Sequence, residues 1–211
     1  MNIGIIGTGN VGGTLGTRWA QAGHKVVFGT REPQAQKTTE LLSKAGSNAR
    51  SAWVQEAVDG SEVVLLATPW EAAEEIVKST RGLDGKILMD ATNPLLPQLA
   101  GLTLGTTTSA AEMIATWAPG AKVVKAINTV GYNIMANPDF GKDKKVTMFY
   151  CGDDKGAKQT VHELITELGF EALDAGPLTQ ARLLEPFAML WISLAYLAGY
   201  GREIGFQFLR R

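Results

Sequence analysis

A glycine-rich stretch near the start of the chain has the residue types and spacing that suit phosphate binding. Gly7-Thr8-Gly9-Asn10-Val11-Gly12 forms a G-x-G-x-x-G pattern, which follows the apolar run IGIIG and opens a segment of helical character. Glycines in this order permit a tight turn and let the backbone approach a pyrophosphate at the N-terminus of a helix. A glycine-rich turn without a ligand is the alternative. The flanking strand and helix favour a dinucleotide site.

The end of the next strand indicates which dinucleotide is bound. Sites for NAD place an Asp or Glu there to accept from the ribose 2′-hydroxyl, whereas an NADP site must accommodate a 2′-phosphate. In HKVVFGTRE, residues 24–32, that position falls on Thr30, and Arg31 offers a guanidinium fork that matches phosphate. Glu32, as a displaced acid, is the competing interpretation. An Arg before Glu-Pro favours NADP, with a helix starting at Pro33.

Polar turns follow three later apolar runs and are expected to complete the site. Thr68-Pro69-Trp70 follows VVLLA, Thr92-Asn93-Pro94 follows ILMDA, and residues 128–131 (NTVG) follow KVVKAI. Ordinary turn chemistry explains such residues equally well one at a time. Ligands of parallel sheets bind beyond the carboxyl ends of the strands, so three such turns on the glycine-loop edge favour a site. Trp70 is equally compatible with a core position.

Groups for acid–base, metal or nucleophilic chemistry are scarce. The chain has two histidines: His24 lies in a turn away from the predicted cleft, and His162 is expected on a helix surface. No Cys and His cluster suits a metal, and Ser109 has the sequence context of a helix N-cap rather than a nucleophile. Forming an alcohol requires a proton donor, whereas hydride exchange with a flavin-like ring needs mainly two stacked rings. The second reaction is favoured, although Asp90, Lys125 or Tyr132 remain possible donors.

The elements that position these residues alternate between strands and helices. Alternation at this spacing, with several runs apolar on consecutive residues, predicts an α/β fold with a Rossmann-type, doubly wound, mostly parallel sheet and a small helical C-terminal part. We expect a Rossmann domain over residues 1–177. The expected strands are 2–7, 25–28, 48–52, 62–67, 86–91, 122–127, 146–151 and 171–174, and the expected helices include 10–22, 71–79, 109–117 and 155–168.

Residues 178–211 behave differently from the rest. ARLLEPFAMLWISLAYLAGYG is a helical pattern, kinked or started by Pro186, and it is apolar on most of its surface. A helix that is apolar nearly all round must be buried. We therefore expect this segment to form a homodimer and to contribute to the acceptor site. Packing wholly on its own sheet is the alternative.

Composition and charge exclude several partners. The 211 residues carry a net charge of −1, which gives no electrostatic basis for binding nucleic acid or a membrane surface. The run KDKK, residues 142–145, is expected to be a solvated loop. Cys151 is the single cysteine and suits a buried position and a reducing compartment. The chain is predicted to be soluble and cytoplasmic and to act on a small-molecule redox acceptor.

Nearly the whole chain resembles the NADP oxidoreductases dependent on the deazaflavin coenzyme F420. The resemblance rests on GTGNVG, the Thr30-Arg31 pair, ATPWE at 67–71, CGDD at 151–154, LDAGPL at 173–178, Arg182 with Glu185, and a final GFQFL. It implies a Rossmann-fold dimer that transfers a hydride between NADPH and a flavin-like ring lying on the nicotinamide. The resulting cofactor set is Gly7, Thr8, Gly9, Asn10, Val11, Gly12, Thr30, Arg31, Thr68, Pro69, Trp70, Asn93 and Ala126.

The acceptor side departs from the archaeal pattern. A lysine used near the 2′-phosphate falls on Ala35, and the histidine and proline of the A-L-H-T-I-P stretch fall on Asn128 and Gly131. The form KAINTVG is instead similar to the cytosolic domains of the six-transmembrane metalloreductases, which pass a hydride from NADPH to a flavin. We therefore assign Asn128, Val130 and Gly131 to the acceptor. The expected acceptor is F420 or FMN/FAD; the alternatives are an imine or ketone reductase, or a non-catalytic NADP-binding redox sensor.

Overall fold

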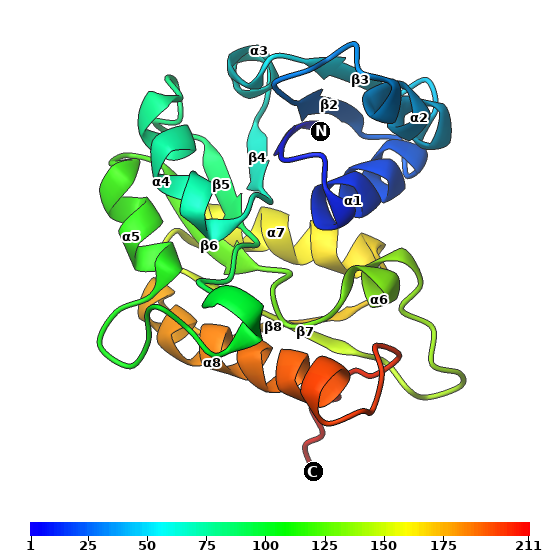
Figure 1. The fold of residues 1–211 in the computed structure, drawn as a ribbon, viewed down its shortest axis with the longest axis vertical. Coiled ribbons are helices and arrows are strands. Elements are labelled where there is room, and N and C mark those ends of the chain that lie inside the picture. Colours follow the sequence, from blue (N-terminus) through cyan, green and yellow to red (C-terminus); the bar gives the residue numbers. More distant parts are fainter.

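A single eight-stranded sheet forms the centre of the computed structural model, which describes residues 1–211 (Figure 1). The strand order is β3-β2-β1-β4-β5-β6-β7-β8, and every neighbouring pair is parallel except β6 and β7. The order reverses between β1 and β4, where ligands of such sheets bind. The strands are β1 (Asn2–Ile6), β2 (Lys25–Gly29), β3 (Ala49–Ala52), β4 (Val63–Leu66), β5 (Ile87–Asp90), β6 (Lys122–Ala126), β7 (Thr147–Gly152) and β8 (Glu171–Asp174).

Helices cover both faces of the sheet, which confirms the doubly wound prediction. One layer holds α1 (Asn10–Gln21), α2 (Gln36–Ala45), α6 (Tyr132–Ala136) and α7 (Lys155–Glu167). The other holds α3 (Val54–Asp59), α4 (Trp70–Ser79), α5 (Ala110–Trp117) and α8 (Ala181–Ile192). Short turns of helix complete the chain: η1 (Pro97–Leu99), η2 (Leu178–Gln180) and the π-helical η3 (Ser193–Leu197).

Two hydrophobic cores result, one on each face. The larger packs Leu15 and Trp19 of α1 and Leu164 of α7 against β1, β2 and β6. The second packs Val77 of α4 and Ile114 of α5 against the other face. Strands that are buried on both faces must be apolar on consecutive residues, as VVLL of β4 is.

One helix start differs from the sequence prediction. Helix α2 begins at Gln36 rather than at Pro33, because residues 33 and 34 form a turn held by a hydrogen bond from Ser51 Oγ to the Pro33 carbonyl (2.9 Å). The sequence left open whether Pro186 starts or kinks the last helix. Helix α8 begins at Ala181, where the helical pattern begins, and continues through that proline.

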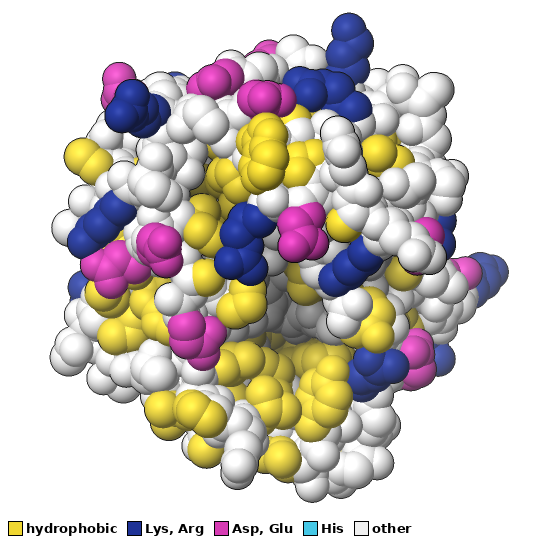
Figure 2. Space-filling model, turned by 45° about the horizontal axis from the view of Figure 1, so that its top comes forward, with side chains coloured by type: hydrophobic (Ala, Val, Ile, Leu, Met, Phe, Trp, Pro, Cys, Tyr) yellow, Lys and Arg dark blue, Asp and Glu magenta, His cyan; other side chains and the backbone are white.

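The molecular surface carries charges of both signs. Figure 2 shows one face of the molecule, hollowed near its centre, with hydrophobic side chains gathered below the hollow and acidic and basic side chains spread around it.

None of the helices combines the length and the apolar character that crossing a bilayer requires.

Candidate functional site

The glycine loop between β1 and α1 gives each of its three glycines a separate role. Gly7 has φ = +105°, and a side chain on it would collide with the Ala67 backbone. A side chain on Gly12 would collide with the Gly7 carbonyl, so this glycine lets α1 pack directly on the strand. A side chain on Gly9 would meet nothing within 4 Å. The turn, the packing contact and the open approach match those of a pyrophosphate loop.

The N-terminus of α1 supplies hydrogen-bond donors at this loop. Gly9 is the N-cap, and no side chain caps the helix. The first turn contains Asn10, Val11 and Gly12, and the helical bonding starts with the Gly13 N–H, which donates to the Gly9 carbonyl (2.8 Å). The preceding N–H groups of a helix have no partner within it, and they carry its partial positive charge. This end of α1 is therefore suited to a phosphate.

The end of β2 brings Thr30 and Arg31 to the same edge. Thr30 N–H donates to the Ala52 carbonyl (3.0 Å), and Thr30 Oγ1 accepts from Glu32 N–H (3.2 Å). Arg31 is exposed, forms no ion pair within the chain and lines a pocket of about 500 Å³. Glu32 lines the same pocket, so the competing acidic group lies beside the guanidinium.

A second pocket, of about 270 Å³, lies beyond the ends of β4 and β5. The side chains that line it are mostly apolar, and they come from the first turn of α1, from the β4–α4 connection with the start of α4, and from the segment after β5. Two hydroxyl oxygens here, Thr68 Oγ1 and Thr92 Oγ1, are buried without a hydrogen-bond partner. Its lining residues are Val11, Ala67, Thr68, Pro69, Trp70, Glu71, Ala91, Thr92, Asn93, Leu95 and Leu96.

Trp70 fits both positions that the sequence left open for it, one in the core and one at the site. It stacks on Trp117 of α5, with ring centroids 5.3 Å apart, and so belongs to the packing between α4 and α5. It also lines the 270 Å³ pocket, as the first residue of α4.

The β6 end is joined to the β5 end by a pair of asparagines. Asn128 Nδ2 donates to Asn93 Oδ1 (3.1 Å) and to the Leu184 carbonyl (3.2 Å), while Asn93 Nδ2 donates to the Asn128 carbonyl (3.1 Å). Asn128 Oδ1 is buried without a partner. The residue before it, Ile127, is buried and has φ = +60°, which is rare for a β-branched residue and marks a strained position.

The remaining residues predicted for this side lie deeper in the molecule. Ala126 and Val130 are buried in the larger core. Gly131 lies so close to Trp191 of α8 that a Cβ on Gly131 would be 2.5 Å from the indole ring. The structure thus brings Thr68, Pro69, Trp70 and Asn93 into one pocket, with Asn128 bonded to Asn93 at its edge. Ala126, Val130 and Gly131 do not line this pocket.

Two of the three candidate proton donors belong to a buried ionic cluster. Lys125 Nζ contacts Asp90 Oδ2 (2.8 Å), Glu185 Oε1 (3.0 Å) and the Thr92 carbonyl (2.6 Å). All three charged side chains are fully buried. Burial lowers the pKa of Lys125, but the charges of Asp90 and Glu185 outweigh it and raise that pKa overall. The ammonium is therefore held in its charged form with all three of its protons engaged.

The other polar candidates have structural partners. Tyr132 Oη accepts from Arg202 Nη1 (2.9 Å), and His162 is half-buried, with Nδ1 3.2 Å from Tyr150 Oη, rather than a simple surface residue. Ser109 caps α5, since its hydroxyl accepts from Glu112 N–H (3.2 Å), as predicted. Cys151 is buried, and burial raises the pKa of its thiol to about 12.

Several residues near the site were given no role there from the sequence. Glu185, noted in the sequence only as part of the motif with Arg182, accepts from the N–H groups of Ala110 and Ala111 at the start of α5 (2.9 and 3.2 Å), across some 75 positions of sequence. Leu95 and Leu96 line the pocket from an irregular segment, and Glu71 lines it from the first turn of α4. Glu71 had a usable clue in its place directly after the Thr68-Pro69-Trp70 turn.

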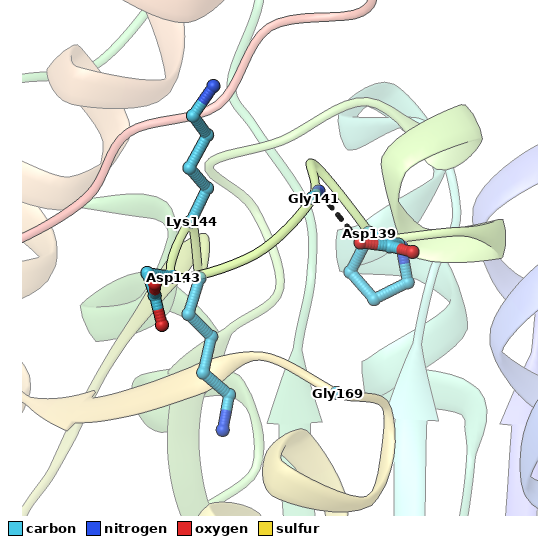
Figure 3. A pocket seen from close by; sticks show the side chains of 7 residues that line it. Asp139, Gly141, Asp143, Lys144 and Gly169 are labelled. Carbon is cyan, nitrogen blue, oxygen red and sulfur yellow. Dashed lines mark hydrogen bonds between the residues drawn. The ribbon is translucent and has the colours of Figure 1, made fainter.

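A third pocket lies at the loop of residues 138–145 and contains none of the predicted site residues. Figure 3 shows Lys144 and Asp143 pointing in different directions, while Asp139 accepts a hydrogen bond from the Gly141 N–H in its own loop (2.8 Å). The side chains of residues 142–145 are exposed, as predicted for KDKK. Because its side chains do not converge, this pocket carries no site.

The fold and the loop geometry are those of a Rossmann-type, dinucleotide-binding protein. The family described as coenzyme F420-dependent NADP oxidoreductase matches residues 2–94. A solved structure from Arthrobacter sp. FB24, whose description proposes an F420-dependent NADP-reductase, is 32% identical with a TM-score of 0.89, and 100% of each chain is covered. The protein therefore belongs to the F420-dependent NADP oxidoreductase family.

Other relatives extend this comparison. The F420-dependent NADP reductase of Methanothermobacter marburgensis is 29% identical, over 92% of each chain. The metalloreductase STEAP3 of Rattus norvegicus is 34% identical over 87% of this chain but only 35% of its own, so the chain spans about a third of that relative. A reductive aminase from Aspergillus terreus is 19% identical with a TM-score of 0.68, covers 94% of this chain and 62% of its own, and shares the fold.

Proposed function

We propose that the protein transfers a hydride between NADPH and a flavin-type ring, either the deazaflavin F420 or FMN/FAD. The observation that carries this proposal is the 270 Å³ pocket, in which Glu71 is the only ionisable lining residue and is itself exposed. The buried ionisable groups beneath it, Asp90 and Lys125, are bonded to each other. Hydride exchange between stacked rings suits such walls, because it relies on distance and orientation.

The residues fit NADP(H) along the edge of the sheet. The open face of Gly9 and the first turn of α1 suit the pyrophosphate, and Thr30 with Arg31 suits the 2′-phosphate. The unpartnered hydroxyls of Thr68 and Thr92 offer hydrogen bonds in the pocket beyond β4 and β5. When bound, NADPH supplies the hydride. Val11, Pro69 and Leu95 would exclude water and orient the rings.

A relative's name supports each kind of acceptor. Two F420-dependent NADP reductases of Methanothermobacter match this chain over 92% of its length, which favours F420. The name of the metalloreductase relative favours a metal chelate as the acceptor, and the similarity of KAINTVG to such enzymes favours a flavin, although the chain spans about a third of that protein. Asn128 and Asn93, bonded to each other at the edge of the pocket, are the side chains we assign to acceptor binding.

An imine or ketone reductase is the second enzymatic candidate, because reductases of that type share the fold. Reduction of an imine or ketone needs a proton donor. Only the exposed Glu71 would supply one from the pocket wall. A non-catalytic NADP-binding redox sensor is the third candidate and would show no turnover with any acceptor.

The C-terminal part, residues 178–211, supports a homodimer. Leu183, Leu190 and Leu197 are exposed by 65, 50 and 61%, and their spacing of seven residues puts the first two on one side of α8. Exposed apolar side chains gathered in this way are typical of an interaction surface. We further propose a cytoplasmic protein, whose single buried cysteine suits a reducing compartment.

The experiment is to measure NADPH oxidation with F420, FMN, FAD, a ferric chelate and a cyclic imine under identical conditions. We expect turnover with at least one flavin-type ring and slower or no turnover with the imine. Turnover with the imine alone would replace the proposed acceptor. Tight NADPH binding without turnover of any acceptor would instead favour the sensor.

A further inference from the structure

Trp53 is the one exposed tryptophan of five in the chain. Its side chain is 58% exposed, whereas Trp19 and Trp191 are buried and Trp70 and Trp117 are half-buried. It directly follows β3 and is the N-cap residue of α3. A large aromatic side chain that stays exposed forgoes the favourable free energy of burial. The position of Trp53 at the edge of the sheet therefore needs an explanation.

The register of the sheet places Trp53 beside the end of β2. Gly29 pairs with Ala52, and the Thr30 N–H extends this ladder to the Ala52 carbonyl (3.0 Å). The next residues along each strand are Arg31 and Trp53, and both line the same pocket of about 500 Å³. Pro33 and Ala35 contribute to its wall. The guanidinium and the indole therefore share one open space.

The walls of this pocket are fixed by hydrogen bonds. Thr30 Oγ1 accepts from Glu32 N–H (3.2 Å), Thr38 Oγ1 donates to the Glu32 carbonyl (3.1 Å), and Ser51 Oγ donates to the Pro33 carbonyl (2.9 Å). These bonds tie the loop after β2 to α2 and to β3. A preformed site loses little entropy when it binds a ligand.

We propose that Trp53 stacks on the adenine ring of NADP(H), beside Arg31 at the 2′-phosphate. This inference rests on the proposed NADP site. Adenine and the 2′-phosphate leave the ribose from adjacent carbons, so the base must lie next to the group that binds the phosphate. The face of an indole is suited to stacking on a base, and it carries no charge to repel the phosphate.

The probe is 2′,5′-ADP, which contains the adenine and the 2′-phosphate but no nicotinamide. Calorimetry on Trp53→Ala should give a dissociation constant about tenfold above wild type, as expected for the loss of one stacked base. Trp53→Phe should restore most of the affinity, because it keeps a flat ring. Phe208→Ala, at a phenylalanine that is 46% exposed beside the start of β7, is the matched control and should bind as wild type does.

A spectroscopic readout separates stacking from a general structural role. Binding of 2′,5′-ADP should quench tryptophan fluorescence in the wild type, and the quenching should be largely lost in Trp53→Phe. Unchanged affinity and quenching in the Trp53 variants would overturn the stacking role and leave the NADP site intact. If neither 2′,5′-ADP nor NADPH bound to the wild type, the proposed function itself would fail.

Discussion

At the level of single residues, Arg31 is the side chain that we expect to decide the choice of cofactor. Its guanidinium lies at the end of β2 with no ion pair in the chain, beside a threonine where an NAD site carries an acid. A fork of N–H donors without an internal partner is free to bind phosphate in two places at once. Glu32 shares the pocket, so the preference for NADP depends on Arg31 outweighing that carboxylate.

Arg31→Ala is expected to raise the dissociation constant for NADPH by about tenfold or more. A hydrogen bond to a charged group contributes about 1.5–3 kcal/mol, and this bond exists only for the phosphate. The dissociation constant for NADH should barely change. Arg81→Ala, in the loop between α4 and β5 and thus at the opposite edge of the sheet, is the control. Equal losses for NADPH and NADH would contradict the assignment of the 2′-phosphate.

Local sequence patterns predicted those candidate site residues whose assignment depends only on the residues next to them in the chain. The glycine loop and Thr30-Arg31 could be found because strand, turn and helix follow one another within a few residues. The partners of Asn128 could not be found in this way, since Asn93 and the Leu184 carbonyl lie 35 and 56 positions away. The left-handed conformation of Ile127 also has no sequence signal, because that residue type disfavours it.

Among the elements, α8 is fixed to the rest of the molecule through the N-terminus of α5. Glu185 accepts two N–H groups there and also contacts Lys125 of β6 (3.0 Å). Nearby, Arg182 of α8 forms two hydrogen bonds with Glu112 of α5 (2.9 and 2.6 Å). The first contact is fully buried, whereas the side chains of the second are 37 and 21% exposed. These two residues belong to the motif that suggested the family, and their visible role is to dock α8.

Glu185→Gln is expected to lower the unfolding free energy by about 3 kcal/mol, because the amide NH2 would replace the acceptor of one helix N–H and the buried Lys125 ammonium would lose one of its two negative charges. For a chain of this size, Tm should fall by on the order of 10 °C. Thermal unfolding followed by circular dichroism provides the measurement. Glu112→Gln, at the more exposed pair, should cost about 1 kcal/mol or less. Equal losses in both variants would show that burial of the Glu185 cluster is not what stabilises α8.

The sheet was predictable from sequence because its strands are apolar on consecutive residues. All eight expected strands are present, with ends that differ by at most one residue. The start of α2 was less predictable, because a hydrogen bond from Ser51 of β3 holds Pro33 in a turn before the helix. For α8, the sequence alone did not decide whether Pro186 starts the helix or lies inside it, and the structure places it inside.

For the whole molecule, the exposed leucines of the C-terminal part are the main unexplained surface. Leu183, Leu190 and Leu197 lie on the outer side of α8 and η3, and Tyr196 and Tyr200 are also exposed. Contiguous apolar surface of this kind on a single chain is unfavourable in water. A second copy of the chain would cover it, which is why we propose a homodimer.

Leu190→Glu should give monomers or insoluble protein, because it places a charge at the centre of this surface. Light scattering coupled to size-exclusion chromatography measures the mass directly. The control is Thr39→Glu, an exposed position on α2 in the opposite helix layer, which should leave the mass unchanged. If Leu190→Glu stayed a soluble oligomer of wild-type mass, the interface would lie elsewhere.

The fate of the transferred hydrogen tests the proposed reaction most directly. NADPH carrying deuterium at both positions of the reactive nicotinamide carbon would be oxidised with F420, and the reduced F420 analysed by mass spectrometry. We predict one deuterium on the reduced deazaflavin, where a carbon-bound hydrogen does not exchange with water. A reduced deazaflavin without deuterium would contradict direct hydride transfer. An absence of reaction with both F420 and flavins, together with deuterium in a reduced imine, would contradict the proposed acceptor.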